Sequence, residues 1–294
     1  MLVDIIIPVA SYHRDVAQSA IDSAHAQTLP ANVIVIEDSN RRGKAWARNT
    51  GIRAGQALFI TFLDADDLLD PRFTAKTVAA YRRGHYVFTD WTLGGKALCT
   101  ADPCRAIWQS GMSHIITTLI PRAAVEHIRG FDESLPALED EDFYYRLQGA
   151  GICPAHVPEA LVNYRRALGR GEMNLETANE ERRKRLDRQM SDYFRTKYGK
   201  RESMCNCNGS PPTPTPAGEK YEGDILVAAN YSPMNKIGPV SGRKYARTGL
   251  GKPLWVDPRD VAARPDWWEP SAAGLTPDVD TVQALALEAL RDAV

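Results

Sequence analysis

The sequence lacks a long hydrophobic run, and this absence excludes a membrane-spanning helix. No continuously apolar stretch is longer than about ten residues, whereas a spanning helix needs roughly 20. The N-terminal segment, Met1 to Ala10, has no basic region and no small-residue cleavage site, so we do not expect a signal peptide. These two absences predict a cytoplasmic protein.

An excess of charge of either sign is also absent. The 294 residues include 36 Lys and Arg and 37 Asp and Glu, and 44% of all residues are hydrophobic. This balance is typical of a globular protein, and it argues against a dedicated nucleic-acid binder, which normally carries a basic excess. The length allows either one large domain or two domains.

Cysteine is scarce, and its spacing shows no pairs. The five cysteines are Cys99, Cys104, Cys153, Cys205 and Cys207. Free thiols in a reducing compartment explain this odd set best. Cys205 and Cys207 could form half of a metal site, but all six histidines lie at or before His156 and no second cysteine pair follows. A thiol-bearing linker is therefore the favoured interpretation.

Proline is concentrated in one stretch, Ser210 to Ala217, where four prolines remove hydrogen-bond donors and fix φ. This stretch predicts an extended linker over residues 203–217, between a domain of residues 1–202 and a small accessory domain of residues 218–294. Residues 174–198 contain no Pro or Gly and more basic than acidic side chains, which predicts a helix. Packing of this helix on the first domain is favoured over a role as a basic patch for an acceptor or a membrane surface.

Strand-like and helix-like segments alternate over the first 100 residues. Val3 to Val9 is a nearly continuous β-branched run, typical of a strand buried on both faces of a parallel sheet. The pattern then predicts a helix at 14–27, a second buried strand at 32–37, a helix at 42–54 and a strand at 57–63. In open parallel sheets, ligands bind beyond the carboxyl ends of the strands. The candidate site residues are therefore those at 10–13, 37–40 and 64–67.

Two clusters of acidic residues stand out. Asp64, Asp66 and Asp67 follow the third predicted strand, where their mutual repulsion favours a hard divalent cation, although a solvated turn or a helix cap would also suit Asp. The second cluster, Glu139 to Asp142, precedes a helical segment with aromatic side chains. Acidic residues there could complement the helix dipole, or one of them could serve as a general base.

Six motifs in order resemble the inverting glycosyltransferases of family 2, which have the GT-A fold. They are Ile7-Pro8 with Tyr12, Val35 to Ser39, Ala47 to Ile52, Phe62 to Asp67, Gly130 to Glu133, and Glu139 to Arg146. The resemblance covers residues 1 to about 170. It implies an α/β fold, Rossmann-like, with a mostly parallel sheet flanked by helices. It also implies a nucleotide-diphosphate-sugar donor, commonly a UDP-sugar, and a Mn²⁺ or Mg²⁺ ion held by Asp64 and Asp66.

The resemblance also implies roles for individual residues. Tyr12 offers a flat face to the nucleobase, and Asp38 can accept a hydrogen bond from the uracil imide. Arg42 and Lys44 would neutralise the diphosphate, whereas Arg48 and Asn49 could equally hold loop and sheet together. The complete expected donor site comprises Pro8, Tyr12, Glu37, Asp38, Arg42, Lys44, Arg48, Asn49, Asp64, Ala65, Asp66 and Arg166.

For the chemical step, the family pattern implies that Asp140 removes the proton from the acceptor hydroxyl, with Glu139 and Asp142 as alternatives. The hydroxyl would attack in line and invert the anomeric carbon, while the metal stabilises the charge on the leaving diphosphate. One departure concerns Ala167, because many family members have a His three residues after the tyrosine that corresponds to Tyr164. The third metal ligand is therefore in doubt. Possible substitutes are Arg165, Arg166 and Arg170 for the phosphate charge, and His114 and His156 for the imidazole.

The C-terminal part predicts a small, β-rich domain. Asp224 to Ala228 and Pro253 to Asp257 are expected strands, Trp267 and Trp268 an expected turn, and residues 277–293 an amphipathic helix. Segments 238–245 and 256–260 loosely resemble small domains of phage structural proteins. Acceptor binding, oligomerisation and docking all stay open for this domain.

Three functions are compatible with these motifs. The leading hypothesis is an inverting glycosyltransferase, resembling a hexosyltransferase, whose acceptor is a saccharide, a lipid-linked molecule, a protein or a nucleic acid. The second is a non-catalytic nucleotide-sugar-binding or structural protein. The third, a sugar nucleotidyltransferase, would require a Gly-rich basic loop directly after the first strand, and Ala10 to His13 is not such a loop.

Overall fold

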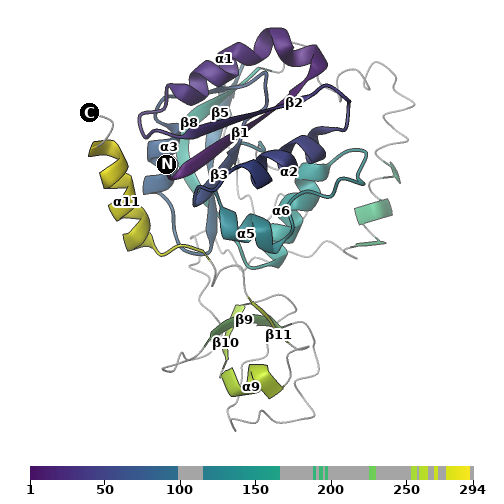
Figure 1. Cartoon of the computed structure of the whole chain (residues 1–294), viewed down its shortest axis with the longest axis vertical. Coiled ribbons are helices and arrows are strands. Elements are labelled where there is room, and N and C mark those ends of the chain that lie inside the picture. The colour runs from purple at the N-terminus through teal and green to yellow at the C-terminus, as the bar shows by residue number, and fades with distance from the viewer. Residues whose placement is uncertain are drawn as a thin grey trace.

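The computed structural model describes residues 1–98, 115–165, 188–189, 192–194, 196–197, 225–229, 253–256, 258–263, 268–270 and 276–291. Its larger part contains two four-stranded sheets with helices packed against them (Figure 1). The α/β class predicted from the sequence is confirmed.

The first sheet has the strand order β2-β1-β3-β7. These strands are β1 (Val3–Ala10), β2 (Asn32–Asp38), β3 (Phe59–Phe62) and β7 (Ile120–Pro121). β1 pairs in parallel with both β2 and β3, and β7 runs antiparallel to β3. The two connections between the first three strands are the helices α1 (Arg14–His25) and α2 (Lys44–Ala54). The predicted β-α-β-α-β unit is therefore confirmed, with boundaries within about two residues of those expected.

Helices α1 and α2 cover opposite faces of this sheet (Figure 1). Ile5 and Ile7 of β1 face the α1 side, whereas Ile6 belongs to the cluster on the α2 side. Gly51 allows α2 to approach β1 closely, because a Cβ there would lie 2.3 Å from the side chain of Ile6. The expectation that the second strand is fully buried was wrong. β2 lies at the edge of the sheet, and Val35 is 38% exposed.

The second sheet has the order β4-β8-β5-β6. Its strands are β4 (Leu68–Leu69), β5 (His85–Leu93), β6 (Lys96–Leu98) and β8 (Cys153–Tyr164). β5 and β8 are parallel, and the two outer strands pair antiparallel to them. The remaining helices of this part are α3 (Phe73–Ala79), α5 (Arg122–His127) and α6 (Glu139–Gly149). In α6, the buried Phe143 stacks on Phe131 at 4.2 Å, which fixes the helix against the α2 side of the first sheet.

A third, antiparallel sheet follows further along the chain, with the order β10-β9-β11 (Figure 1). It is formed by β9 (Ile225–Ala229), β10 (Pro253–Val256) and β11 (Trp268–Pro270), accompanied by helix α9 (Pro258–Ala263). The two strands expected from the sequence are present, but Trp268 begins a strand instead of lying in a turn. Trp267 lies outside the described residues.

The last helix, α11 (Val279–Arg291), packs against α3 of the larger part (Figure 1). Val282 is fully buried in the core on the α1 side of the first sheet. The Tyr81 hydroxyl donates to the Pro277 carbonyl oxygen at 2.8 Å, and the Gly84 N–H donates to Thr276 Oγ1 at 2.9 Å. Residues 276–291 therefore pack against the first 100 residues of the chain. The domain boundaries themselves stay a prediction. Within the described ranges, every helix is too short or too polar to cross a membrane.

Candidate functional site

The candidate site lies where the loops after β1, β2 and β3 meet. β1 is the middle strand, so its continuation, the 3-10 turn η1 (Ser11–His13), lies between the loop after Asp38 and the loop after Phe62. From β1 the chain turns to one face of the sheet, and from β2 it turns to the other. Such a divergence creates a crevice at the carboxyl ends of parallel strands, where ligands bind in open α/β sheets.

Arg48 of α2 connects the two acidic clusters. Its side chain is 1% exposed; Nη2 donates to Asp64 Oδ1 at 2.8 Å, and Nη1 donates to Glu139 Oε1 at 2.8 Å. The guanidinium carbon lies 5.3 Å from the ring centre of Phe131. One buried cation therefore links the loop after β3 to the start of α6, two segments that are far apart in the sequence.

Lys44 adds a second cation beside Asp64. The Asp64 carboxylate raises the pKa of Lys44 above its ordinary value even though burial acts in the opposite direction. For Asp64, burial opposes ionisation, but Lys44 and Arg48 outweigh it and hold the pKa of this carboxyl below its usual range. Asp64 is therefore a carboxylate with two nearby cations.

The other two acids of the first cluster differ from Asp64. The Asp66 carboxylate accepts no hydrogen bond from the part of the chain that the structure describes. Asp67 is buried and accepts the Arg165 backbone N–H at 2.9 Å, while burial and the nearby Asp64 raise its pKa to about 8. The Arg165 side chain donates to the Asp66 carbonyl oxygen and to Ser19 Oγ, so this arginine holds the loop.

The second cluster also contains three different environments. Glu139 is paired with Arg48. Asp142 is fully buried and paired with Arg146 at 2.7 Å and Lys197 at 2.8 Å. Asp140 remains partly accessible and makes no salt bridge within the described ranges, and Oδ1 accepts the Glu141 N–H at 2.9 Å. Burial and the neighbouring Glu139 raise the pKa of Asp140 to about 7.

The predicted nucleobase loop is shaped by Asp38. Its Oδ1 accepts the Arg42 N–H at 2.8 Å, and its Oδ2 accepts the Gly43 N–H at 2.7 Å. This loop needs Gly43, whose φ of 97° lies in the left-handed region. Glu37 Oε2 forms an exposed salt bridge with Arg14 Nη2 at 3.0 Å. Both polar side chains at the end of β2 are thus engaged, but only Asp38 organises the site loop.

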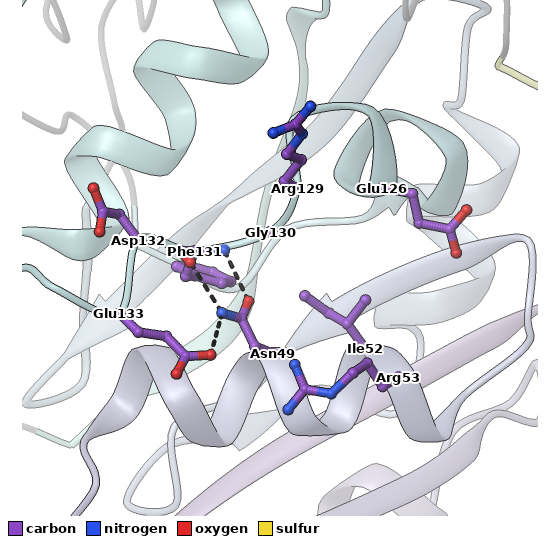
Figure 2. Close-up of a pocket in the computed structure, with 9 residues that line it drawn as sticks. All are labelled: Asn49, Ile52, Arg53, Glu126, Arg129, Gly130, Phe131, Asp132 and Glu133. Carbon is purple, nitrogen blue, oxygen red and sulfur yellow. Dashed lines mark hydrogen bonds between the residues drawn. The ribbon is translucent and has the colours of Figure 1, made fainter.

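Asn49 holds the segment before α6. Its Oδ1 accepts the Phe131 N–H at 2.8 Å, and its Nδ2 donates to the Phe131 carbonyl oxygen and to Glu133 (Figure 2). Gly130, with φ of 68°, is required here because a Cβ would lie 2.4 Å from Asn49 Oδ1. A pocket of about 520 Å³ lies beside this contact. It is lined by Asn49, Ile52, Arg53, Glu126, Arg129, Gly130, Phe131, Asp132 and Glu133.

The structure places the remaining expected residues as follows. Pro8 is buried within β1, Ala65 is buried after β3, Tyr12 is partly exposed on η1, and the Arg42 guanidinium lies 4.6 Å from the ring centre of Trp46. His156 is held by Asp90 at 2.7 Å and stacks on Phe88, so it is engaged on the second sheet. Arg166, Ala167, Arg170 and His114 lie outside the described residues.

Sequence reasoning missed two features of the site. The pairing of Lys197 with Asp142 depends on the tertiary structure, and no local sequence pattern predicts it. His13, which is 5% exposed, has an Nε2 atom with no hydrogen-bond partner among the described residues. Its place directly after the first strand was a signal, because it lies in one of the three segments where a ligand is expected.

Comparison with known proteins supports this description. Residues 5–99 match the family described as Glycosyl transferase family 2. The match confirms, over this segment, the resemblance to glycosyltransferase family 2 inferred from the motifs. The sequence has no significant match among curated proteins.

Similar solved structures include chains of two proteins. S. aureus TarS is 14% identical with a TM-score of 0.49, and the alignment covers 56% of this chain and 37% of TarS. S. aureus TarS 1-349 in complex with UDP-GlcNAc is 16% identical with a TM-score of 0.46, over 56% of this chain and 58% of that one. The mannosyltransferase PcManGT from Pyrobaculum calidifontis, in complex with GDP-Man and Mn²⁺, is 17% identical with a TM-score of 0.43, over 55% of this chain and 56% of that one. The alignments thus span less than two thirds of these proteins.

Proposed function

We propose that the protein transfers a sugar from a nucleoside-diphosphate donor, favouring UDP-sugars, to an acceptor hydroxyl with inversion at the anomeric carbon. The observation that carries this proposal is the charged array at the carboxyl edge of the first sheet. There, Arg48 bridges Asp64 and Glu139, and Asp140 lies beside them with a pKa of about 7. Such an array supplies cations for a diphosphate and a carboxylate for proton transfer within one site.

At the donor end, Asp66 is the residue best suited to hold Mn²⁺ or Mg²⁺. Its carboxylate accepts no hydrogen bond from the described residues, whereas Asp64 is engaged by Arg48. Within the described part of the chain, no three His, Cys, Asp or Glu side chains converge on a point where a metal would fit. We therefore propose that Asp66, with Asp64 at its side, provides the protein ligands and that diphosphate oxygens supply others. A metal there would stabilise the negative charge that develops on the leaving diphosphate.

For the nucleobase, we propose stacking on Tyr12 and a hydrogen bond from the uracil imide to Asp38. Each Asp38 oxygen accepts one backbone N–H. A carboxylate oxygen has a further acceptor site, so the loop contacts leave capacity for the ring N–H. The same two contacts fix the orientation of the carboxylate before the donor binds, which lowers the entropic cost of binding.

We assign the general base to Asp140. In the proposed step, the acceptor oxygen bonds to the anomeric carbon, the bond to the diphosphate oxygen breaks, and the hydroxyl proton passes to Asp140. A pKa of about 7 is suited to this role, because half of the groups are then ionised at neutral pH. Glu139 and Asp142 are less suitable, since each is paired with at least one cation.

A test of the proposed function begins with binding. Thermal shift and calorimetric titration of the full chain with UDP-sugars and GDP-sugars, with and without Mn²⁺, should identify a preferred donor. Release of UDP from that donor then separates an enzyme from a non-catalytic binding protein. If no nucleotide-sugar raises the melting temperature and none binds in the titration, the proposed function is wrong.

The metal assignment has its own variant. Asp66→Asn should remove the gain in UDP affinity that Mn²⁺ provides while leaving the affinity in EDTA unchanged. Asp22→Asn, an exposed position on α1, serves as the matched control. An Asp66→Asn protein that keeps its full response to Mn²⁺ would exclude this carboxylate as a ligand.

A further inference from the structure

His13 is a buried imidazole with an unsatisfied atom at the centre of the candidate site. The residue is 5% exposed, and Nε2 is buried without a hydrogen-bond partner in the described part of the chain. The large majority of buried side-chain polar atoms in proteins are paired. Among the residues that the structure describes, no group pairs with this atom, which leaves it for a bound ligand.

The position of His13 restricts what that partner is. His13 ends the η1 turn, which follows the middle strand β1 and lies between the loops after β2 and β3. The ring of Tyr12 packs edge-on against the imidazole, with ring centres 4.6 Å apart. The imidazole is therefore held next to the residue proposed to stack on the nucleobase.

Charges near His13 point to an anionic ligand. Asp64 has Lys44, Arg48 and His13 among its neighbours, and Arg48 Nη2 already donates to Asp64 Oδ1 at 2.8 Å. Three residues able to donate to an anion, His13, Lys44 and Arg48, thus lie near Asp64 in the loop after β3. Phosphoryl oxygens only accept hydrogen bonds, so a diphosphate can accept one from an imidazole N–H.

We propose that the Nε2–H of His13 donates a hydrogen bond to the diphosphate of the nucleotide donor and is a specificity-determining contact for it. The inference rests on the proposed function, because it places the same donor in the same crevice. It adds a residue outside the six motifs that resemble glycosyltransferase family 2.

Affinities for UDP and for uridine test the contact. His13→Ala should weaken UDP about 10- to 100-fold, the range expected for a hydrogen bond to a charged group, while uridine binds as before. His13→Gln should retain most of the UDP affinity, because its side-chain amide places an N–H near the position of Nε2. His25→Ala, at the exposed end of α1, is the matched control and should behave as the wild type.

The titrations are carried out in Mn²⁺ and again in EDTA, and near-UV circular dichroism checks that each variant is folded. An equal loss of UDP and uridine affinity in His13→Ala would mean that the residue shapes the nucleobase site. A loss seen only with Mn²⁺ would assign the imidazole to the metal instead. Either outcome, or unchanged UDP binding, overturns the inference while the proposed function stands. A wild-type protein that binds no nucleoside diphosphate overturns both.

Discussion

The two acidic clusters of the site, Asp64 to Asp67 and Glu139 to Asp142, are similar in sequence but differ in their cations. In the first cluster, Arg48 forms a salt bridge with the first acid, Asp64, and Lys44 lies nearby. In the second cluster, cations bind the two outer acids, with Arg48 on Glu139 and both Arg146 and Lys197 on Asp142. The positions of the cations, contributed by other segments, therefore decide which carboxylate is available.

Each cluster includes a carboxylate near its middle that makes no salt bridge within the described structure. In the first cluster it is Asp66, which is suited to a metal; in the second it is Asp140, whose raised pKa suits it to proton transfer. Arg48 belongs to both clusters, and its fixed position would hold the two functions at a constant separation. The comparison predicts that neutralising Asp66 or Asp140 affects donor binding or turnover, whereas removing Arg48 lowers the free energy of unfolding.

The largest effect is expected from Asp140→Asn. The amide keeps the shape of the side chain but cannot accept the proton, so the rate of UDP release from the preferred donor should fall about 10²- to 10⁴-fold. The affinity for UDP should be unchanged, because Asp140 is proposed to contact the acceptor. A coupled assay for UDP and a calorimetric titration measure the two quantities.

Glu141→Gln is the matched control for that variant, since it neutralises the next acid on the same turn of α6. It should release UDP at close to the wild-type rate. Normal turnover by Asp140→Asn would remove the base assignment. A collapse in Glu139→Gln or Asp142→Asn instead would transfer the role to that residue.

Arg48→Met tests the shared cation. The substitution leaves Asp64 and Glu139 without their common partner, and breaking a buried ion pair in this way typically costs about 3–5 kcal/mol of unfolding free energy. Urea denaturation followed by fluorescence measures the change. Arg53→Met, on the exposed side of the same helix, should cost little. If Arg48→Met unfolds at the same urea concentration as the wild type, the bridge does not stabilise the two clusters.

The sequence predicted the first sheet well because its signals are local. The β-branched run from Val3 to Val9 marks β1, and the helical spacing after it marks α1, so neither depends on distant residues. The edge position of β2 could not be predicted in this way. Its apolar residues match those of a central strand, and only the strand order leaves Val35 exposed.

For the site, the sequence located the acids but not their partners. Many arginines and lysines are equivalent in the sequence, and the pairing of Arg48 with Glu139 joins residues that are brought together only by the complete fold. The return of α11 to the first part of the chain is another long-range contact of this kind. Such pairings decide which carboxylates have a cation beside them, so the role proposed for Asp140 depends on the tertiary structure as much as on its motif.

Lys197→Met should have a smaller effect than Arg48→Met. Asp142 loses the Lys197 ammonium but keeps Arg146, and losing a hydrogen bond to a charged group typically costs about 1.5–3 kcal/mol. Urea denaturation again provides the measurement, with the exposed Arg82→Met as control. Unchanged stability would show that the contact between Lys197 and α6 contributes nothing. UDP affinity should not respond in either case.

The smallest effect, and the sharpest test of the contrast between the two clusters, is the pH dependence of kcat/KM. Asp140 acts as a base only when ionised, and its pKa of about 7 means that kcat/KM should rise roughly tenfold between pH 6 and pH 8 and then level off.

The neighbouring Glu139 contributes to raising this pKa, so Glu139→Gln should move the rising limb of the pH profile of kcat/KM to lower pH. The residual activity of Asp140→Asn should lack the limb. An unchanged midpoint in Glu139→Gln would show that Glu139 does not contribute to the raised pKa of Asp140. If kcat/KM of Asp140→Asn still rises between pH 6 and pH 8, another group titrates. The contrast between the two clusters would then not explain the pH dependence.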